Sequence, residues 1–259
     1  MKSALPLFLF ILICLQGAVF AEFRTFENDF GDKVEAQLIE LKDSETVVTL
    51  RLRSGLEIDA MLSAFSQQDK KFILEWWGEV VAEKQLLRED SRLNVSAKMN
   101  RKSKDGQYSW HNRVDDETVS FYPEILIENE ELETFSGNQV RVVIVAEDKR
   151  NEGQKLIVSA ATKEVNLPRQ STTSLETDPF RLRLYEYSRS GGRDYAYGYE
   201  YEGYVVVIKN ARGEVTHQRA SKRKYLTNMK VIMECKAGEM YDETLDYKLK
   251  VRPNSYYVQ

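Results

Sequence analysis

The strongest constraint on the fold is the stretch 180–210, in which apolar and polar residues alternate along two long runs. A period of two is the pattern of a pleated strand, whose successive side chains point to opposite faces. Gly191 and Gly192 lie between the runs and accept the positive φ angles of a tight reversal. The stretch therefore predicts one long β-hairpin. After Gly203 the apolar residues change from odd to even positions, which predicts a β-bulge at Glu202 and Gly203.

The amino terminus has the three regions of a secretory signal peptide. Lys2 precedes an apolar run at 5–15, and small residues follow at 19–21. The apolar run is shorter than the roughly 20 residues of a spanning helix, which disfavours the alternative of a membrane anchor. We therefore expect residues 1–21 to be cleaved. The mature chain from Glu22 is then secreted or periplasmic and has no transmembrane segment.

Charge and cysteine content narrow the range of partners and cross-links. The chain has 37 Lys and Arg residues against 41 Asp and Glu, and this mild acidity disfavours nucleic acid, whose binding surfaces are concentrated in basic residues. Cys14 lies in the predicted signal peptide, so Cys235 remains without an intramolecular disulfide partner. Apolar burial must therefore stabilise the fold.

A first module is expected over residues 22–82. Apolar, β-branched runs at 34–41, 47–52 and 56–60 are separated by short polar turns, which predicts the strands of a small barrel. Ser66 and Asp69 have the spacing of a capping box, so we expect a helix to begin at Ser66. Its buried stripe then consists of Phe72, Ile73, Trp76, Trp77, Val80 and Val81.

The module also carries a set of residues at characteristic spacing: Phe23-Arg24-Thr25-Phe26, Gly31, Val34-Glu35-Ala36, Val47-Val48-Thr49-Leu50, Ser54-Gly55, Ile58, Leu62-Ser63 and Ser66-x-x-Asp69-x-x-Phe72-Ile73. This set resembles the Sla-type homology domain. Relatives occur in secreted proteins of planctomycete-like and verrucomicrobia-like bacteria, and in a eukaryotic endocytic adaptor where the module binds short peptide motifs. The sequence departs from that pattern at Met61 and Phe65. The resemblance implies an SH3-like barrel and a peptide as ligand.

Residues 83–91 are strongly charged and predict a linker or the end of the helix, where we place the domain boundary. From 92 to 252, eight or nine alternating runs separated by turn signals predict an Ig-like antiparallel β-sandwich. The run at 140–145 is apolar on nearly every residue, as in a strand covered on both faces. One added helix is expected, capped by Ser221, ended by Gly238 and buried along Leu226, Met229, Ile232 and Met233. Residues 253–259 form a tail, and the whole chain is mainly β.

Few residues have the pattern of a reactive site. His111 and His217 are far apart in the sequence and have no metal-ligand spacing, and Cys235 is interpreted as a small buried hydrophobic residue. We therefore expect no cofactor, no metal and no catalytic residue. The alternative is a hydrolase or glycan-processing enzyme with an unrecognised carboxylate site, drawn from the pairs at 115–116 and 130–131. Adjacent strand residues face opposite sides, which disfavours that alternative.

The remaining candidate site is the tyrosine-rich part of the predicted hairpin, because seven of the fourteen tyrosines lie between 185 and 204. Tyrosine provides rigid, amphipathic contact area for peptides and sugars, although cross-strand pairing of aromatic residues explains the pattern equally well. We expect these tyrosines to be partly exposed and Ala196 and Gly198 to be covered. The predicted function is non-enzymatic binding of a peptide, protein or envelope glycan. The candidate ligand-binding residues are Tyr195, Tyr197, Tyr199, Tyr201, Arg189 and Arg193.

Overall fold

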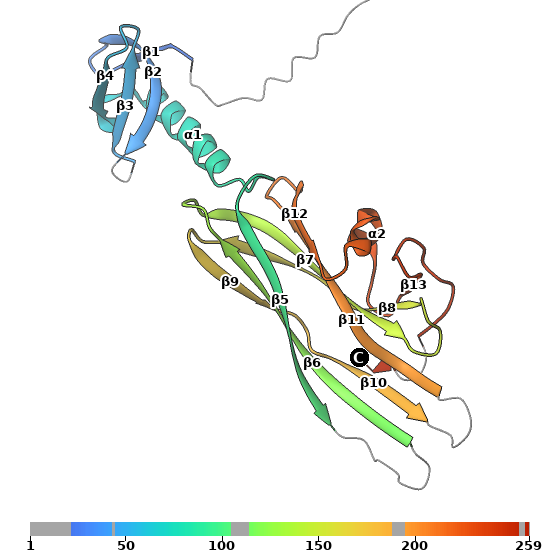
Figure 1. Ribbon diagram of the computed structural model, residues 1–259. Helices are drawn as coiled ribbons and strands as arrows, with labels where there is room; N and C mark the ends of the chain where they lie inside the picture. The colour runs from blue at the N-terminus through green and yellow to red at the C-terminus, as the bar shows by residue number, and fades with distance from the viewer. Residues whose placement is uncertain (1–21, 43–44, 105–113, 188–194, 254–256, 259) are drawn as a thin grey trace, which may run out of the picture. The chain divides into compact units, whose positions relative to one another are not determined.

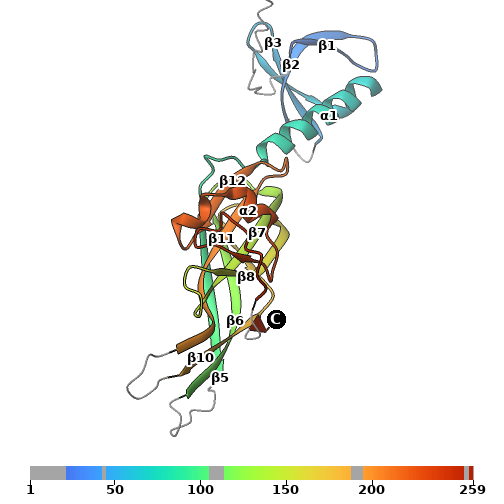
Figure 2. The ribbon, with the colours of Figure 1, turned by 90° about the vertical axis from the view of Figure 1, so that its right-hand side faces the viewer.

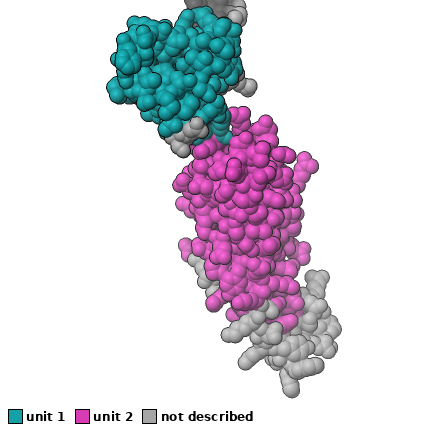
Figure 3. Space-filling view, turned by 90° about the vertical axis from the view of Figure 1, so that its left-hand side faces the viewer, with its two compact units in different colours: residues 1–84 teal, residues 85–259 magenta. Residues whose placement is uncertain are grey.

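The computed structural model describes residues 22–42, 45–104, 114–187, 195–253 and 257–258 (Figure 1). As predicted, the chain is mainly β, with two antiparallel sheets and few helices. It divides into two compact units, 1–84 and 85–259, which Figure 3 colours teal and magenta. The division falls within the charged segment 83–91. Leu86 and Leu87 of that segment are buried, and Leu87 belongs to the core of the second unit.

The first unit is a four-stranded antiparallel sheet of order β1-β2-β3-β4, followed by two helices (Figure 1). An isolated bridge joins Asn28 to Phe65, so the chain after β4 approaches the end of β1 as in a small barrel. The elements are β1 (Arg24–Glu27), β2 (Lys33–Lys42), β3 (Val47–Leu52), β4 (Glu57–Met61), η1 (Leu62–Ala64) and α1 (Gln67–Lys84).

The predicted capping box begins helix α1. The Ser66 hydroxyl accepts a hydrogen bond from the Asp69 amide at 3.2 Å and donates to its carboxylate at 3.1 Å. Asp69 is buried and also accepts from the Glu27 amide and from Arg24, each at 2.9 Å. One carboxylate therefore fixes the start of the helix and ties it to β1. The predicted apolar stripe packs on the sheet through Phe72, Ile73, Trp76, Trp77 and Val80.

The second unit is a sandwich of two antiparallel layers (Figures 1 and 2). One layer contains β5, β6, β9, β10 and β14, and the other contains β7, β8, β11, β12 and β13. The strands are β5 (Leu93–Lys104), β6 (Val114–Asn129), β7 (Phe135–Asp148), β8 (Lys155–Leu167), β9 (Ser171–Glu176), β10 (Phe180–Tyr187), β11 (Tyr195–Lys209), β12 (Val215–Ala220), β13 (Met240–Tyr241) and β14 (Tyr257–Val258). β14 lies in the predicted tail and pairs with β10.

Two apolar clusters hold this unit together. The first fills the space between the layers and includes Ile125, Ile127, Val142, Ile144, Val206 and Ile208. The second lies on the outer face of β7, β8 and β11, beneath η2 (Arg223–Leu226) and α2 (Met229–Glu234), and includes Val143, Val145, Val205, Val207, Tyr225 and Ile232. β7 is therefore covered on both faces, as its continuous apolar run predicts.

The predicted single helix at 221–238 is wrong in its extent. Asn228 caps α2 by accepting from the Val231 amide at 3.3 Å, and α2 ends before Cys235. Ser221 caps no helix, because its hydroxyl accepts instead from the Tyr204 amide of β11 at 2.9 Å. This contact to a neighbouring strand competes with capping, and the helical segment divides into two short pieces.

Candidate functional site

The stretch 180–210 forms a hairpin only near its end. β10 and β11 pair over four residues, from Leu184 with Gly198 to Tyr187 with Tyr195, and from Tyr199 onward β11 pairs with β7. The prediction of one long hairpin is therefore wrong, and its turn lies outside the described residues. Gly198 lies where β11 leaves β10 and begins to pair with β7. Its φ is +107°, and a Cβ there would lie 2.0 Å from the Arg183 carbonyl oxygen, so glycine allows this change of partner.

The predicted bulge is present. The register between β11 and β7 shifts between Tyr201 and Gly203, which leaves Glu202 as the extra residue. A Cβ at Gly203 would lie 2.0 Å from the hydroxyl of Ser221, the residue after β12, so a side chain there would displace the contact of Ser221 with the Tyr204 amide. The bulge carries the Glu202 side chain to a buried lysine, Lys155.

The tyrosine series is divided by the change of layer. Tyr195 is half exposed and stacks on Tyr197 at 6.5 Å between ring centroids, while Arg150 lies 5.6 Å from the centre of the Tyr197 ring. Tyr199 is 1% exposed, and its hydroxyl contacts the Met240 sulfur at 3.9 Å. Tyr201 is half-buried. The expectation of partial exposure is thus right for three tyrosines and wrong for Tyr199.

The prediction that Ala196 and Gly198 are covered is confirmed only in part. Gly198 is buried, whereas Ala196 is half-buried. Arg189 and Arg193 lie outside the described residues. The four tyrosines therefore do not form one continuous face. Tyr195 and Tyr197 remain on the outside, whereas Tyr199 and Tyr201 turn toward the core.

Tyr199 and Tyr201 instead line a cavity of about 150 Å³ between the layers. We call it the interlayer pocket. Apolar residues of β6 and β10 form much of its wall, and charged residues of β5, β6 and β11 are also present. Its lining consists of Arg101, Glu117, Val119, Phe121, Leu182, Leu184, Tyr199, Glu200 and Tyr201.

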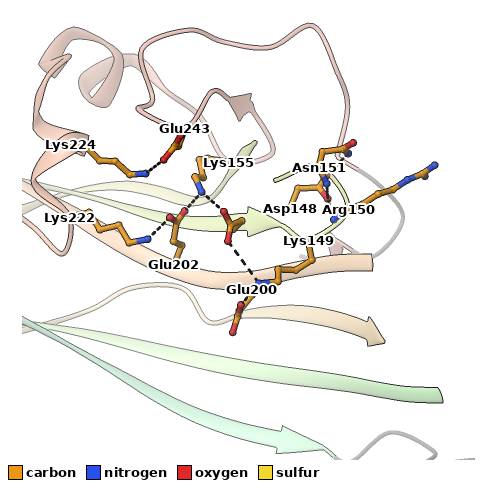
Figure 4. A network of polar contacts seen from close by, with 11 residues as sticks. Asp148, Lys149, Arg150, Asn151, Lys155, Glu200, Glu202, Lys222, Lys224 and Glu243 are labelled. Carbon is orange, nitrogen blue, oxygen red and sulfur yellow. Dashed lines mark hydrogen bonds and ion pairs between the residues drawn. The ribbon is translucent and has the colours of Figure 1, made fainter. Parts of the chain in front are cut away.

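A network of ion pairs lies on the β7–β8–β11 layer (Figure 4). The Lys155 side chain is 1% exposed, and its Nζ lies 2.7 Å from Glu147 and 2.8 Å from Glu202. Glu202 also pairs with Lys222, and Lys149 lies between Glu147 at 3.9 Å and Glu200 at 2.8 Å. The acidic and basic members of the network alternate in space, although they come from distant parts of the sequence. Because they are far apart along the chain, sequence patterns did not reveal the network.

The buried pair of this network, Lys155 and Glu202, favours its charged state. Burial by itself lowers the pKa of Lys155, but the hydrogen bonds to Glu147 and Glu202 outweigh burial and raise it. Burial by itself raises the pKa of Glu202, but hydrogen bonds to Lys155 and Lys222 outweigh it and lower the pKa. A general acid requires the opposite shift, so Glu202 is suited to holding strands together.

One member of each carboxylate pair weighed as an enzymatic site is also ion-paired. Asp116 accepts from the guanidinium of Arg183, with Nε at 2.7 Å, and this hydrogen bond lowers the Asp116 pKa. Glu131 accepts from the Arg92 side chain at 3.2 Å and from its amide at 2.9 Å, and these contacts lower the Glu131 pKa. Each carboxylate therefore holds two segments of the chain together.

The contacts of His217 and Cys235 are those of residues that stabilise the fold. His217 lies half-buried in β12, with Nε2 at 2.8 Å from the Ser91 carbonyl oxygen, and His111 lies outside the described residues. Cys235 is buried and its thiol pKa is raised by that burial, which confirms its interpretation as a small core residue. Among the described residues, no group of three or more His, Cys, Asp and Glu residues could hold a metal ion. Likewise, no helix within the described ranges is long and apolar enough to cross a membrane.

The first unit contains a larger and more apolar groove, of about 260 Å³. We call it the seam groove because residues of both β1 and β4, the outer strands of the sheet, line it. Polar residues at its rim come from the end of β1 and the turn that follows. The apolar lining is Phe26, Val34, Leu50, Ile58, Ala60, Ala64 and Phe65, and the polar lining is Glu27, Asn28, Asp32 and Lys33.

Hydrogen bonds order the polar rim of the seam groove. The Asn28 side-chain oxygen accepts from the amides of Phe30 at 2.9 Å and Asp32 at 2.8 Å. Gly31 adopts a φ of +87°, which the turn requires. This Asx-type turn leaves the Phe30 side chain 91% exposed. No sequence pattern marks these residues as a site, because a groove between two outer strands depends on the curvature of the sheet.

Comparison with known proteins adds little to this geometry. No family model matches the chain, and no curated protein matches it. Among solved structures, the crystal structure of a protein from Akkermansia muciniphila is similar with a TM-score of 0.23 and 13% sequence identity. That similarity covers 52% of this chain and 73% of the other.

Proposed function

We propose that this protein is an extracytoplasmic binding protein with no catalytic role, and that its first unit binds an extended peptide segment of a partner in the seam groove. The observation that carries the proposal is the groove itself: an apolar hollow of about 260 Å³ lined by both outer strands of a curled sheet. Binding sites of this kind combine apolar walls with a few polar groups that fix orientation.

The edge of β4 favours an extended ligand. Among the described strands, β4 pairs only with β3, so its other edge is available for a further strand. Ile58 and Ala60 line the groove, whereas the alternate residues of β4 are exposed. A peptide added along β4 would therefore gain main-chain hydrogen bonds while every second side chain enters the groove.

The residues of the inner wall indicate which side chain of a peptide would enter the groove. Phe26, Leu50 and Phe65 are buried and form the inner wall, which suits an aromatic or branched aliphatic anchor. Lys33, whose side chain is 63% exposed, lies at the rim and pairs with Glu27 at 3.4 Å, so an acidic residue of the ligand would share this cation with Glu27. The Sla-type resemblance of residues 22–82 agrees with a peptide ligand.

The binding proposal can be tested by selecting peptides from a displayed heptapeptide library on the mature chain, 22–259. The affinity of a selected peptide is then measured by fluorescence polarisation for two variants of β4. Ala60→Trp fills the groove, and Met61→Trp adds the same bulk to an exposed position of the same strand. We expect Ala60→Trp to weaken binding at least tenfold and Met61→Trp to change it less than twofold.

The far-UV circular dichroism of both variants is compared with that of the wild type. If Ala60→Trp does not fold, Ile58→Ala replaces it, with the same expected direction. Equal affinity of the wild type and a folded groove variant, or failure of the library to yield a saturable ligand, would overturn the proposal.

Export is a separate part of the proposed function. The charged, apolar and small-residue regions of 1–21 support cleavage after Ala21. Mass spectrometry of the protein from its native host should find Glu22 at the amino terminus, in the extracytoplasmic fraction. Soluble cytoplasmic protein that retains Met1 would contradict this part and leave the groove unaffected.

A further inference from the structure

The interlayer pocket has two charged residues with no ion-pair partner among the described residues. Arg101 is exposed on β5, and Glu117 is half-buried on β6. Glu200, the third charged residue of the lining, is already paired with Lys149 at 2.8 Å. The pocket therefore offers one positive and one negative group to a ligand.

Strand register sets the distance between these two groups. Arg101 is paired with Phe121 across β5 and β6, and Glu117 precedes Phe121 by four residues on β6. With a rise of about 3.3 Å per residue and about 4.8 Å between strands, their backbone positions are about 14 Å apart. Two side chains that stand perpendicular to the sheet at this separation do not meet, so a ligand could bridge them.

The wall between the two charges is apolar. Phe121, Leu182 and Tyr199 are buried and line the pocket, and the Tyr201 ring packs on Phe121 at 5.6 Å between centroids. Burial raises the pKa of Tyr201 to about 12, so its hydroxyl keeps its proton at neutral pH and can donate a hydrogen bond. The ligand that matches has an apolar middle and opposite charges at its ends.

We propose that the interlayer pocket binds a short zwitterionic peptide of dipeptide size, with its ammonium group at Glu117, its carboxylate at Arg101 and an apolar side chain against Phe121 and Leu182. Two extended residues span about 7 Å, and an ionic contact of about 3 Å at each end brings the total to about 13 Å. This length is close to the separation of about 14 Å between the two backbone positions, from which both side chains stand perpendicular to the sheet. The site is distinct from the seam groove and does not depend on the proposed function of the first unit.

The test is isothermal titration calorimetry of the mature chain with leucyl-leucine. Saturable binding is expected, and Glu117→Gln and Arg101→Gln should each weaken it at least tenfold. N-acetyl-leucyl-leucine lacks the ammonium group, so its weaker binding should respond to Arg101→Gln and not to Glu117→Gln. The amidated and acetylated dipeptide, which has neither charge, should show no saturable binding.

Matched controls separate the pocket from general charge effects and from the seam groove. Lys102→Gln and Glu128→Gln remove exposed charges from β5 and β6 outside the lining, and should change the affinity less than twofold. Ala60→Trp should also leave leucyl-leucine binding unchanged. The melting temperature of each variant verifies folding. Absence of saturable binding to the wild type, equal binding of the fully blocked dipeptide, or unchanged affinity in both charge variants would overturn the proposal.

Discussion

The two ends of β11 differ in environment although both have the alternating pattern of a strand. At the amino-terminal end, Tyr195 and Tyr197 pair with β10 and remain partly exposed. At the carboxyl-terminal end, residues 205–208 lie between β7 and β12 and are buried on both faces. Two glycines, Gly198 and Gly203, mark the transition between these environments. Exposure along a long strand therefore depends on which neighbouring strand each part pairs with.

The largest expected effect is at the point where β11 changes partner. Gly198→Val places a Cβ against the Arg183 carbonyl oxygen and at a positive φ, so both overpacking and backbone strain oppose the native fold. We expect a loss of about 5 kcal/mol in the free energy of unfolding of the second unit, measured by urea denaturation. Gly213→Ala is the control, because its φ is +81° and no atom lies within 4 Å of the added Cβ. A loss of about 1 kcal/mol is expected there; equal losses would contradict the close approach.

Truncating tyrosines on either side of Gly198 compares the two environments directly. Tyr199→Ala removes a fully buried ring from the core and should lower the free energy of unfolding by about 4 kcal/mol. Tyr197→Ala removes a half-buried ring that contacts Tyr185, Tyr195 and Arg150, and should cost about 1 kcal/mol. Thermal and urea denaturation both measure this difference. Similar losses for the two variants would mean that the tyrosines share one face.

The bulge provides a third test through its ion pairs. Lys155→Met leaves Glu147 and Glu202 without the buried cation that lies between them, and should cost about 3 kcal/mol at pH 7. Combining it with Glu147→Gln and Glu202→Gln should recover part of this loss, because Lys149 and Lys222 neutralise these carboxylates less fully than Lys155 does, and the triple variant removes them. A triple variant less stable than Lys155→Met would show that the three side chains do not act as one ion-pair group.

The smallest expected effect is the dependence of this contribution on pH. The pKa of Glu202 is lower in the folded chain, so its pairing stabilises the fold above the unfolded pKa of about 4.3. This contribution is lost as the pH falls through the folded pKa. Acidification from pH 7 to 3.5 should therefore destabilise the wild type more than Lys155→Met, by on the order of 1 kcal/mol. Parallel pH profiles of the two proteins would contradict the predicted coupling.

Sequence patterns determined the features that depend on a few neighbouring residues. The capping box of Ser66 and Asp69, the bulge at Glu202 and the burial of Cys235 were all predicted correctly. Each follows from a local hydrogen bond, a local period or the size and polarity of one side chain. The mainly β composition follows from the same kind of information.

Contacts between residues far apart in the sequence establish which strands pair and which side chains lie between them. Tyr199 is buried because β11 changes its neighbour from β10 to β7 at this point. Strands distant in the sequence also bring Glu147, Lys155 and Glu202 together. The seam groove likewise arises because a curled sheet places residues of β1 and β4 around one hollow. A period of two specifies that side chains alternate, but it does not specify the neighbour that covers each face. Long-range pairing determines that neighbour, and with it both candidate binding sites.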